Sequence, residues 1–222
     1  MENPTTITGH SVYEALLSFA ERVFTNRIDH TFGKAELVQP PGVNSGGAEH
    51  PLAVFLDGLS AYPSQQLAVL LALLPELGPD FLGRMLKEKV PEGKELLAFG
   101  GLRGKQHRGV LPTGETLQFL LGGNNVGARL ATREVLASTS PLIKSRLLRL
   151  LPPPAGEPAM AGQLTIDPDW LESVLTGRVT PPVFSQSFPA RAVETELGWE
   201  DLVLDPKTAA ALVPLRYYLT FS

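Results

Sequence analysis

Cysteine is absent from the 222-residue sequence. No disulfide, thiolate zinc site, iron–sulfur cluster or cysteine nucleophile can therefore form, and a reducing compartment is expected. Long apolar runs are lacking too, since the longest ends at Leu74 and falls far short of the roughly 20 residues that span a bilayer. The first residues carry Glu2 where a secretory signal needs basic and then apolar residues. These absences predict a cytoplasmic protein without a membrane segment.

Charged residues are scarce as well. They make up 19% of the chain, against 43% hydrophobic residues, and the formal net charge is −4. This balance is typical of a soluble globular protein, and it argues against a general nucleic-acid binder. The length suffices for one medium domain or two small ones. Glycine (21 residues) and proline (20 residues) are more frequent than average, which predicts short elements and many turns.

Helical signals dominate the first ninety residues. Ser11 and Glu14 have capping-box spacing, and the apolar periodicity after them predicts an amphipathic helix over residues 11 to about 26. The stretch 39–51 is rich in proline and glycine, which predicts an exposed loop. Residues 52–60 fit either a short buried strand or a helical turn. We expect two further helices, one capped by Ser64 and broken at Pro75, the other opened by Pro79 and running to about Lys87.

The pattern changes after residue 95, where short apolar runs alternate with glycines. The glycines at 100 and 101 predict a turn with positive φ. Thr113 is the expected N-cap of a helix that ends at Gly122 and Gly123. Beyond it we expect helices over 126–137 and 140–151, a hairpin or wing within 155–166, and a short helix over 167–175.

Three short helices followed by a wing are the outline of a winged helix. The predicted fold class is α+β, mainly α. It consists of an N-terminal helical domain (1–92), a winged-helix-like domain with a short β-hairpin (93–183), and a junction segment (184–222). Trp170 and Trp199 are expected to anchor cores, with each indole N–H on a buried acceptor.

The charge is unevenly distributed. Residues 101–150 hold eight basic and two acidic residues, a balance of +6, so the remainder carries −10. This asymmetry fits either a nucleic-acid face or a basic module packed on an acidic one. In a winged helix the segment 140–151 would enter the major groove, although a five-residue separation turns Lys144 and Arg149 about 140° apart on a helix. The candidate contact residues are Arg103, Lys105, Arg108, Lys144, Arg146 and Arg149.

The sequence contains no complete catalytic motif. The segment GGLRGK (100–105) resembles a phosphate loop, but it has one residue too few between its glycines and Gln106 where a hydroxyl is needed. The segment GLSAY (58–62) resembles a nucleophile elbow with Ser60 as nucleophile, but Tyr62 replaces the second glycine. The four histidines lack metal-ligand spacing, and each is expected at the surface or at a cap. Neither a catalytic nor a metal residue is predicted.

Three segments resemble a known family: 107–123 (HRGVLPTGETLQFLLGG), 162–177 (GQLTIDPDWLESVLTG) and 184–212 (FSQSFPARAVETELGWEDLVLDPKTAAAL). They are similar to the N-terminal, winged-helix-like region of AAA+ ATPases of extracellular contractile injection systems, particles of the antifeeding-prophage type. The most specific string, FPAxxxETxxxWxDLVL, resembles the family's junction to its ATPase core. Its matching residues include Phe188, Pro189, Glu194, Thr195, Trp199, Asp201 and Leu202.

The resemblance implies a chain that stops just inside an AAA+ core. The sequence contains no Walker A loop, Walker B acids or arginine finger, so we expect no ATP hydrolysis, and ATP and magnesium only with the core. The leading hypothesis is a monomeric, non-catalytic adaptor that binds injection-system components or cargo. The alternatives are a nucleic-acid-binding module that uses residues 101–150, and a small hydrolase that uses Ser60.

Overall fold

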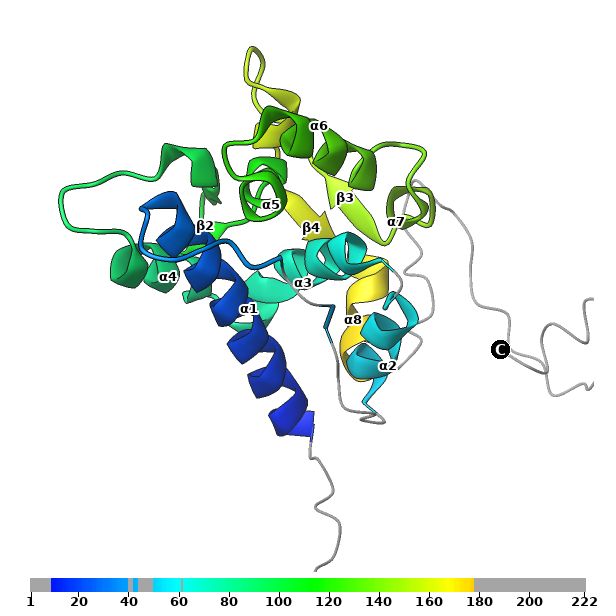
Figure 1. The fold of residues 1–222 in the computed structure, drawn as a ribbon. Coiled ribbons are helices and arrows are strands. Elements are labelled where there is room, and N and C mark those ends of the chain that lie inside the picture. The colour runs from blue at the N-terminus through cyan, green and yellow to red at the C-terminus, as the bar shows by residue number, and fades with distance from the viewer. Residues whose placement is uncertain (1–8, 40–41, 44–49, 61, 178–222) are drawn as a thin grey trace, which may run out of the picture. The chain divides into compact units, whose positions relative to one another are not determined.

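The structure is a computed structural model that describes residues 9–39, 42–43, 50–60 and 62–177. Among these residues, helices α1 to α4 precede the first strand, and short strands then lie between the later helices (Figure 1). The elements are α1 (Gly9–Thr31), α2 (Pro51–Gly58), α3 (Pro63–Leu77), α4 (Phe81–Lys89), η1 (Leu97–Phe99), β1 (Leu102–Arg103), β2 (Val110–Leu111), α5 (Gly114–Gly122), α6 (Val126–Val135), α7 (Pro141–Lys144), β3 (Leu148–Leu150), η2 (Ala159–Ala161), β4 (Leu164–Ile166) and α8 (Pro168–Thr176).

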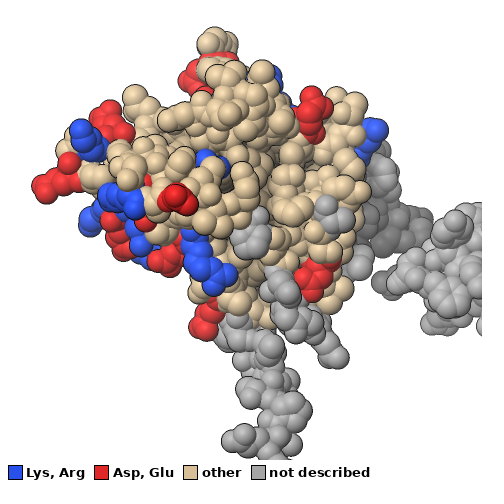
Figure 2. All heavy atoms as spheres, in the orientation of Figure 1, with Lys and Arg blue, Asp and Glu red and all other residues tan. Residues whose placement is uncertain are grey.

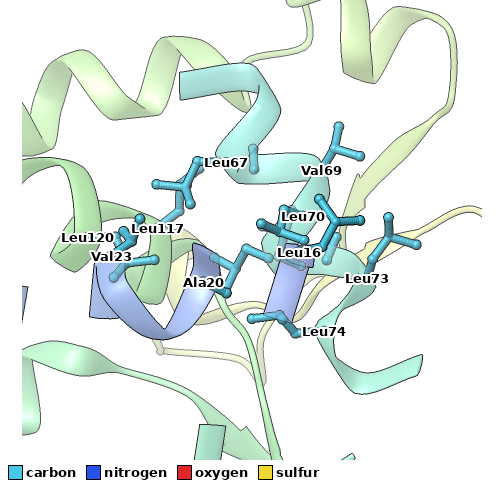
Figure 3. Close-up of a cluster of buried hydrophobic side chains, with 14 of the residues drawn as sticks. Leu16, Ala20, Val23, Leu67, Val69, Leu70, Leu73, Leu74, Leu117 and Leu120 are labelled. Carbon is cyan, nitrogen blue, oxygen red and sulfur yellow. The ribbon is translucent and has the colours of Figure 1, made fainter. Parts of the chain in front are cut away.

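Helix α3 is the centre of the core. Every residue from Gln66 to Leu74 is buried, so the helix has no solvent-facing stripe and neighbours must cover it on all sides. Helices α1, α4, α5 and α6 and strand β4 supply that cover. Figure 3 shows side chains of α1 and α5 converging on the α3 leucines. The apolar run that is too short to cross a membrane thus forms the middle of a folded core.

A chain of phenylalanines crosses the core from α4 to α5. The ring of Phe24 lies 5.8 Å from that of Phe81 and 5.9 Å from that of Phe99, which lies 5.9 Å from Phe119. All four side chains are at most 2% exposed. Elements on both sides of residue 92 therefore share one core, within the compact unit formed by residues 1–180. The predicted division of the chain at residues 92 and 183 stays a prediction.

Gln66 explains why part of the expected loop 39–51 is not exposed. Its side-chain oxygen accepts the N–H of Val43 (3.0 Å), and its amide nitrogen donates to the carbonyls of Val43 (3.2 Å) and Leu56 (2.7 Å). Val43 is consequently 5% exposed. The prediction of an exposed loop is wrong at this residue, because a buried amide satisfies the backbone groups that water would otherwise bind.

Several predicted helices are present with different ends. Helix α1 begins at Gly9 and runs to Thr31, so Ser11 lies inside it and is not its cap. Helix α3 begins at Pro63, with Tyr62 in place of Ser64 at the cap. It continues past Pro75 to Leu77, since the N–H of Gly78 donates to Leu74 and closes the last turn. Helix α4 begins at Phe81, two residues after the predicted proline, and ends at Lys89.

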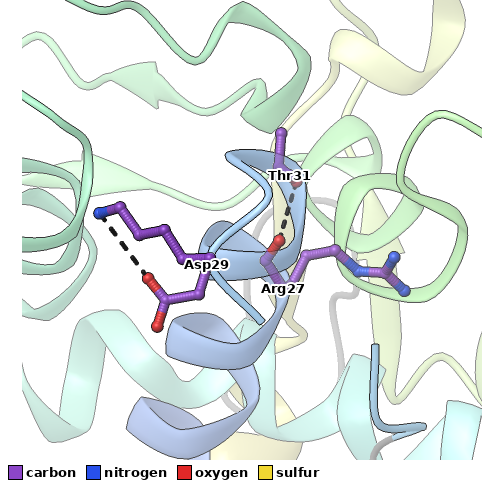
Figure 4. Close-up of polar contacts among 4 residues, drawn as sticks. Arg27, Asp29 and Thr31 are labelled. Carbon is purple, nitrogen blue, oxygen red and sulfur yellow. Dashed lines mark hydrogen bonds and ion pairs between the residues drawn. The ribbon is translucent and has the colours of Figure 1, made fainter. Parts of the chain in front are cut away.

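The C-terminal end of α1 carries local polar contacts. The Thr31 hydroxyl donates to the carbonyl of Arg27 (2.8 Å), and Lys34 lies 4.0 Å from the Asp29 carboxylate (Figure 4). The Arg27 side chain extends away from both contacts, toward a neighbouring helix. It is 4% exposed and donates to two carbonyls of α5.

Helix α5 confirms its predicted caps. The Thr113 hydroxyl accepts the N–H of Thr116 (3.2 Å), and the Thr116 hydroxyl accepts the N–H of Thr113 (3.0 Å), a reciprocal capping box. Glu115 lies in the first turn, and the helix ends at Gly122. Gly100 and Gly101, with φ of 67° and 86°, form the predicted turn. Residues 52–60, whose sequence fits either a buried strand or a helical turn, belong to helix α2 as far as Gly58.

The predicted helix 140–151 is wrong beyond its first turn. Helix α7 ends at Lys144, and Arg146 adopts a left-handed φ of 58° that a helix cannot contain. Residues 148–150 then form β3, antiparallel to β4, with Leu148 opposite Ile166 and Leu150 opposite Leu164. The prediction of a hairpin within 155–166 is therefore wrong, because only β4 lies in that segment and its partner strand, β3, comes from the predicted helix. Helix α8 (Pro168–Thr176) is confirmed. The finding is a mainly α, α+β fold with two separate two-stranded antiparallel sheets among the described residues.

Tyr13 joins the first described helix to the last. Its hydroxyl donates to the carbonyl of Leu175 (3.0 Å), and burial raises the pKa of this phenol. The folded state therefore favours the neutral phenol more than the unfolded chain does. The stability from this preference is complete below the unfolded pKa of about 10 and is lost as the pH rises through the folded pKa.

We predict that Tyr13→Phe lowers the free energy of unfolding at neutral pH by about 1 kcal/mol, because one hydrogen bond is lost. Above pH 10 the gap between variant and wild type should narrow, since the variant has no phenol at this position to ionise. Urea unfolding at a series of pH values measures both effects. Tyr62→Phe is the control, because this side chain is 58% exposed, and it should leave the free energy of unfolding at neutral pH unchanged. A gap that widens above pH 10 would contradict the prediction.

Candidate functional site

Residues 103–109, which we call the β1–β2 turn and which include the last residue of β1, carry three of the six predicted contact residues. Arg103, Lys105 and Arg108 are all exposed there, and Arg103 stands opposite Val110 in the two-residue register. The turn packs closely on the start of α4, because a methyl group added to Gly109 would overlap the carbonyl oxygen of Pro79. Glycine at this position allows the basic turn to lie against the helix.

An open cleft of about 890 Å³ lies between α4 and this turn. The α4 side contributes Arg84, Lys87, Asp80 and Glu88, and the turn contributes Arg103, His107 and Arg108. Figure 2 shows the charged side chains of the visible face crowded at the end where Figure 1 places α4, while most of the remaining face is uncharged. The cleft itself is lined by charged side chains from both elements.

Two of the cleft residues, Arg84 and Glu88, form an ion pair with each other. Arg84 lies 3.8 Å from Glu88, one helical turn away, and stacks 5.6 Å above the ring of Phe81. Within the described part of the chain, no ion pair links Lys87, Arg103 or Arg108 to a carboxylate. The Nε2 atom of His107 is buried and has no hydrogen-bond partner among the described residues. The cleft thus holds three cations, Lys87, Arg103 and Arg108, that no described carboxylate pairs.

The other three predicted contact residues lie elsewhere in the fold. Lys144 is in the last turn of α7, Arg146 is in the connection after it, and Arg149 is on β3, 3.6 Å from Asp167. Figure 1 shows α7 and β2 on opposite sides of the molecule. The structure therefore does not bring the six residues into one surface, and the helix expected to carry the second three ends at the first of them, Lys144.

Helix α6 exposes its apolar side chains, a feature that the sequence reading missed. Val126 is 70% exposed and Leu130, one turn later, is 58% exposed. The side of α6 that faces α5 is polar: Gln118 donates to the Arg129 carbonyl (2.9 Å), Arg129 donates to the Gly123 carbonyl (3.2 Å), and Thr132 is buried. In most surface helices the apolar face packs inward, whereas α6 exposes Val126 and Leu130 and packs only Val135 against the core.

The remaining candidate residues show ordinary structural roles. His50 caps α2, where Nδ1 accepts the N–H of Leu52 (3.2 Å), which confirms a predicted capping histidine. Ser60 is exposed in the turn after α2, and its N–H donates to the Asp57 carbonyl (3.0 Å). Trp170 is 39% exposed, so its prediction as a core anchor is wrong. Val174, one helical turn later on α8, is the buried residue instead, at 3% exposed.

The described residues hold neither a metal-binding cluster nor a single membrane-spanning helix. No group of three or more histidine and acidic side chains within them could hold a metal ion. No single helix in these ranges is long and apolar enough to cross a membrane, although α3 and α4, bent by 101°, reach that composition as a pair. The predicted junction residues lie outside the described residues: Phe188, Pro189, Glu194, Thr195, Trp199, Asp201 and Leu202.

Comparison of the chain with protein-family models, with curated proteins and with solved structures finds no match. Two surfaces of the described residues are the candidates for function, the outer face of α6 and the charged cleft beside α4.

Proposed function

We propose that this chain is a protein-recognition module that uses the outer face of α6. The supporting observation is the pair of exposed apolar side chains, Val126 and Leu130, on one face of that helix. Apolar side chains gathered at a surface mark interaction sites more often than singly scattered ones do. Gly127 and Ala131 lie beside them and are exposed, so a partner could approach the helix backbone closely.

The internal contacts of α6 support a binding role for this face. Asn125 caps the helix through the N–H of Ala128 (2.9 Å), and Arg129 and Gln118 tie its inner side to α5. The outer side chains are therefore presented by a helix that is held in place before a partner arrives. Such preorganisation lowers the entropic cost of binding.

The finer content of the proposal comes from the resemblance noted above. The module would belong to an AAA+ ATPase of a contractile injection system, with a winged-helix-like fold, and would act in the cytoplasm as a monomer. It would couple the motor to particle components or cargo during assembly, loading or disassembly. ATP and magnesium would bind only with an ATPase core, so the purified 222-residue chain should show no ATP turnover. Robust hydrolysis would count against the proposal.

The double variant Val126→Ser, Leu130→Ser tests the proposed surface. Binding to individually purified injection-system components encoded near the gene should weaken at least about tenfold, because exposed apolar anchors carry much of an interface's energy. The free energy of unfolding should stay within about 0.5 kcal/mol, since neither side chain is buried. Biolayer interferometry and urea unfolding measure the two quantities.

Val38→Ser, Val54→Ser is the matched control, because these valines are 64% and 58% exposed on other parts of the fold. It removes two exposed apolar side chains without touching α6. If the control weakens binding as much as the α6 variant, or if neither does, α6 is not the recognition face.

Nucleic-acid binding through residues 101–150 remains a second candidate function. The observation that favours it is the group of exposed cations on the β1–β2 turn. The predicted reading helix is absent, so binding would engage phosphates without base-edge contacts from such a helix. A steep loss of affinity with rising salt would support it.

A further inference from the structure

The cleft between α4 and the β1–β2 turn has two walls of different charge. The charged side chains of the turn wall are both basic, Arg103 and Arg108. The α4 wall is mixed, because Lys87 stands beside the Arg84–Glu88 pair and Asp80. A ligand that fits both walls presents negative charge toward the turn and Lys87, and hydrogen-bond-donating groups toward the carboxylates of Asp80 and Glu88.

The turn wall is held in a fixed position before any ligand binds. Gly101 donates its N–H to the Thr113 hydroxyl (3.1 Å), which ties the base of the turn to the α5 cap. The other arm rests on α4 through the close approach of Gly109 to Pro79. Holding several cations in one place without counter-charges is unfavourable, so an anionic partner would be stabilised there.

The cleft favours an acidic peptide over a nucleic acid. A nucleic-acid strand carries negative charge along its whole backbone and would meet Asp80 and Glu88 on the α4 wall. Single-stranded bases also need aromatic surfaces to stack on, and the residues that line the cleft include no phenylalanine, tyrosine or tryptophan. A peptide can direct carboxylates to the arginine forks and its backbone N–H groups to the acidic side chains.

We propose that this cleft binds an acidic segment of a protein partner through Lys87, Arg103 and Arg108. The proposal rests on the proposed protein-recognition function and adds a second contact site to it. The cleft volume of about 890 Å³ is within the range of pockets that bind small ligands, so it takes a short segment and not a whole domain. His107 lines the same site.

The test uses the full chain and a fluorescein-labelled peptide of alternating glutamate and glycine, followed by fluorescence anisotropy. Arg103→Gln, Arg108→Gln should weaken peptide binding at least about tenfold. Lys144→Gln, Arg146→Gln changes the net charge equally at two other exposed cations and should weaken it less than about twofold. The same peptide with glutamine in place of glutamate should not bind.

Equal weakening by the two double variants would overturn the proposal, because it would show attraction to overall charge alone. Tighter binding of oligothymidine than of the acidic peptide, lost in the Arg103→Gln, Arg108→Gln variant, would also overturn it and assign the cleft to nucleic acid. Competition by millimolar inorganic phosphate with no peptide preference would reduce the cleft to a simple anion site.

Histidine NMR provides a readout that does not depend on variants. Addition of the peptide should shift the imidazole resonances of His107, while those of His30 and His50, which contact backbone groups elsewhere, stay in place. Unchanged His107 resonances at saturating peptide would contradict the proposal.

The Val126→Ser, Leu130→Ser variant should bind the peptide as the wild type does, so failure of the cleft and failure of the α6 surface are distinguishable.

Discussion

Phe24→Ala is expected to lower the free energy of unfolding by about 3 to 5 kcal/mol, the usual range for a large aromatic side chain removed from a core. Phe24 is 0% exposed and its ring contacts two other buried rings, those of Phe81 and Phe99. Since small domains have only about 5 to 15 kcal/mol of stability in total, this loss is a large fraction of the whole. Urea unfolding followed by circular dichroism measures it.

The same experiment tests the domain division predicted from the sequence. Phe24 lies on α1 and Phe99 in η1, on opposite sides of residue 92. If the shared core makes one cooperative unit, the variant shifts a single transition to lower urea. Two separate transitions, of which only the first moves, would instead support independent domains 1–92 and 93–183.

Phe32→Ala is the control for aromatic loss as such. Phe32 packs only partly buried at the edge of the same cluster, so its removal should cost less than half as much, because less apolar area is lost. The single variants Phe24→Leu and Phe99→Leu, together with their combination, form a double-mutant cycle that isolates the contact between the two rings. A coupling energy of about 0.5 to 1.5 kcal/mol is expected for such a pair.

Elements with strong local signals could be predicted from the sequence. Thr113 has an N-cap hydroxyl, an acidic residue follows it and two glycines end the helix, and α5 has those ends. Helix α8 likewise follows its Asp-Pro start. Where residues 147–151 (LLRLL) present nearly continuous apolar character, periodicity cannot separate helix from strand. Pairing with 164–166, well removed in sequence, decides for a strand.

The candidate sites show the same limit. The excess of positive charge in 101–150 identified Arg103 and Arg108, but not their partner wall on α4, because Lys87 lies outside that window and only the packing of the turn brings it near. For α6, the spacing of Val126 and Leu130 reveals an apolar stripe. It does not reveal that the stripe faces solvent, which depends on hydrogen bonds from Gln118 of a different helix.

Arg27→Met is the second variant with a large expected effect, a loss of about 2 to 4 kcal/mol. Arg27 is 4% exposed, donates from Nε to the Leu120 carbonyl (2.8 Å) and from Nη2 to the Leu121 carbonyl (3.2 Å). These carbonyls belong to the last turn of α5, where a helix lacks internal donors and carries the negative end of its dipole. Methionine fills the space and leaves both oxygens without these donors.

Burial lowers the pKa of Arg27 from its ordinary value, so the folded state bears a desolvation cost that offsets part of the hydrogen-bond energy. This offset is why the expected loss is smaller than two charge-assisted hydrogen bonds of about 1.5 to 3 kcal/mol each would give at the upper end. Arg27→Lys should fall between wild type and methionine, because it keeps the charge but not the two-pronged donor geometry. Arg22→Met makes the same exchange at an exposed position on the same helix and should cost less than about 0.5 kcal/mol. Equal losses at positions 22 and 27 would show that the effect comes from helix α1 itself and not from the bridge to α5.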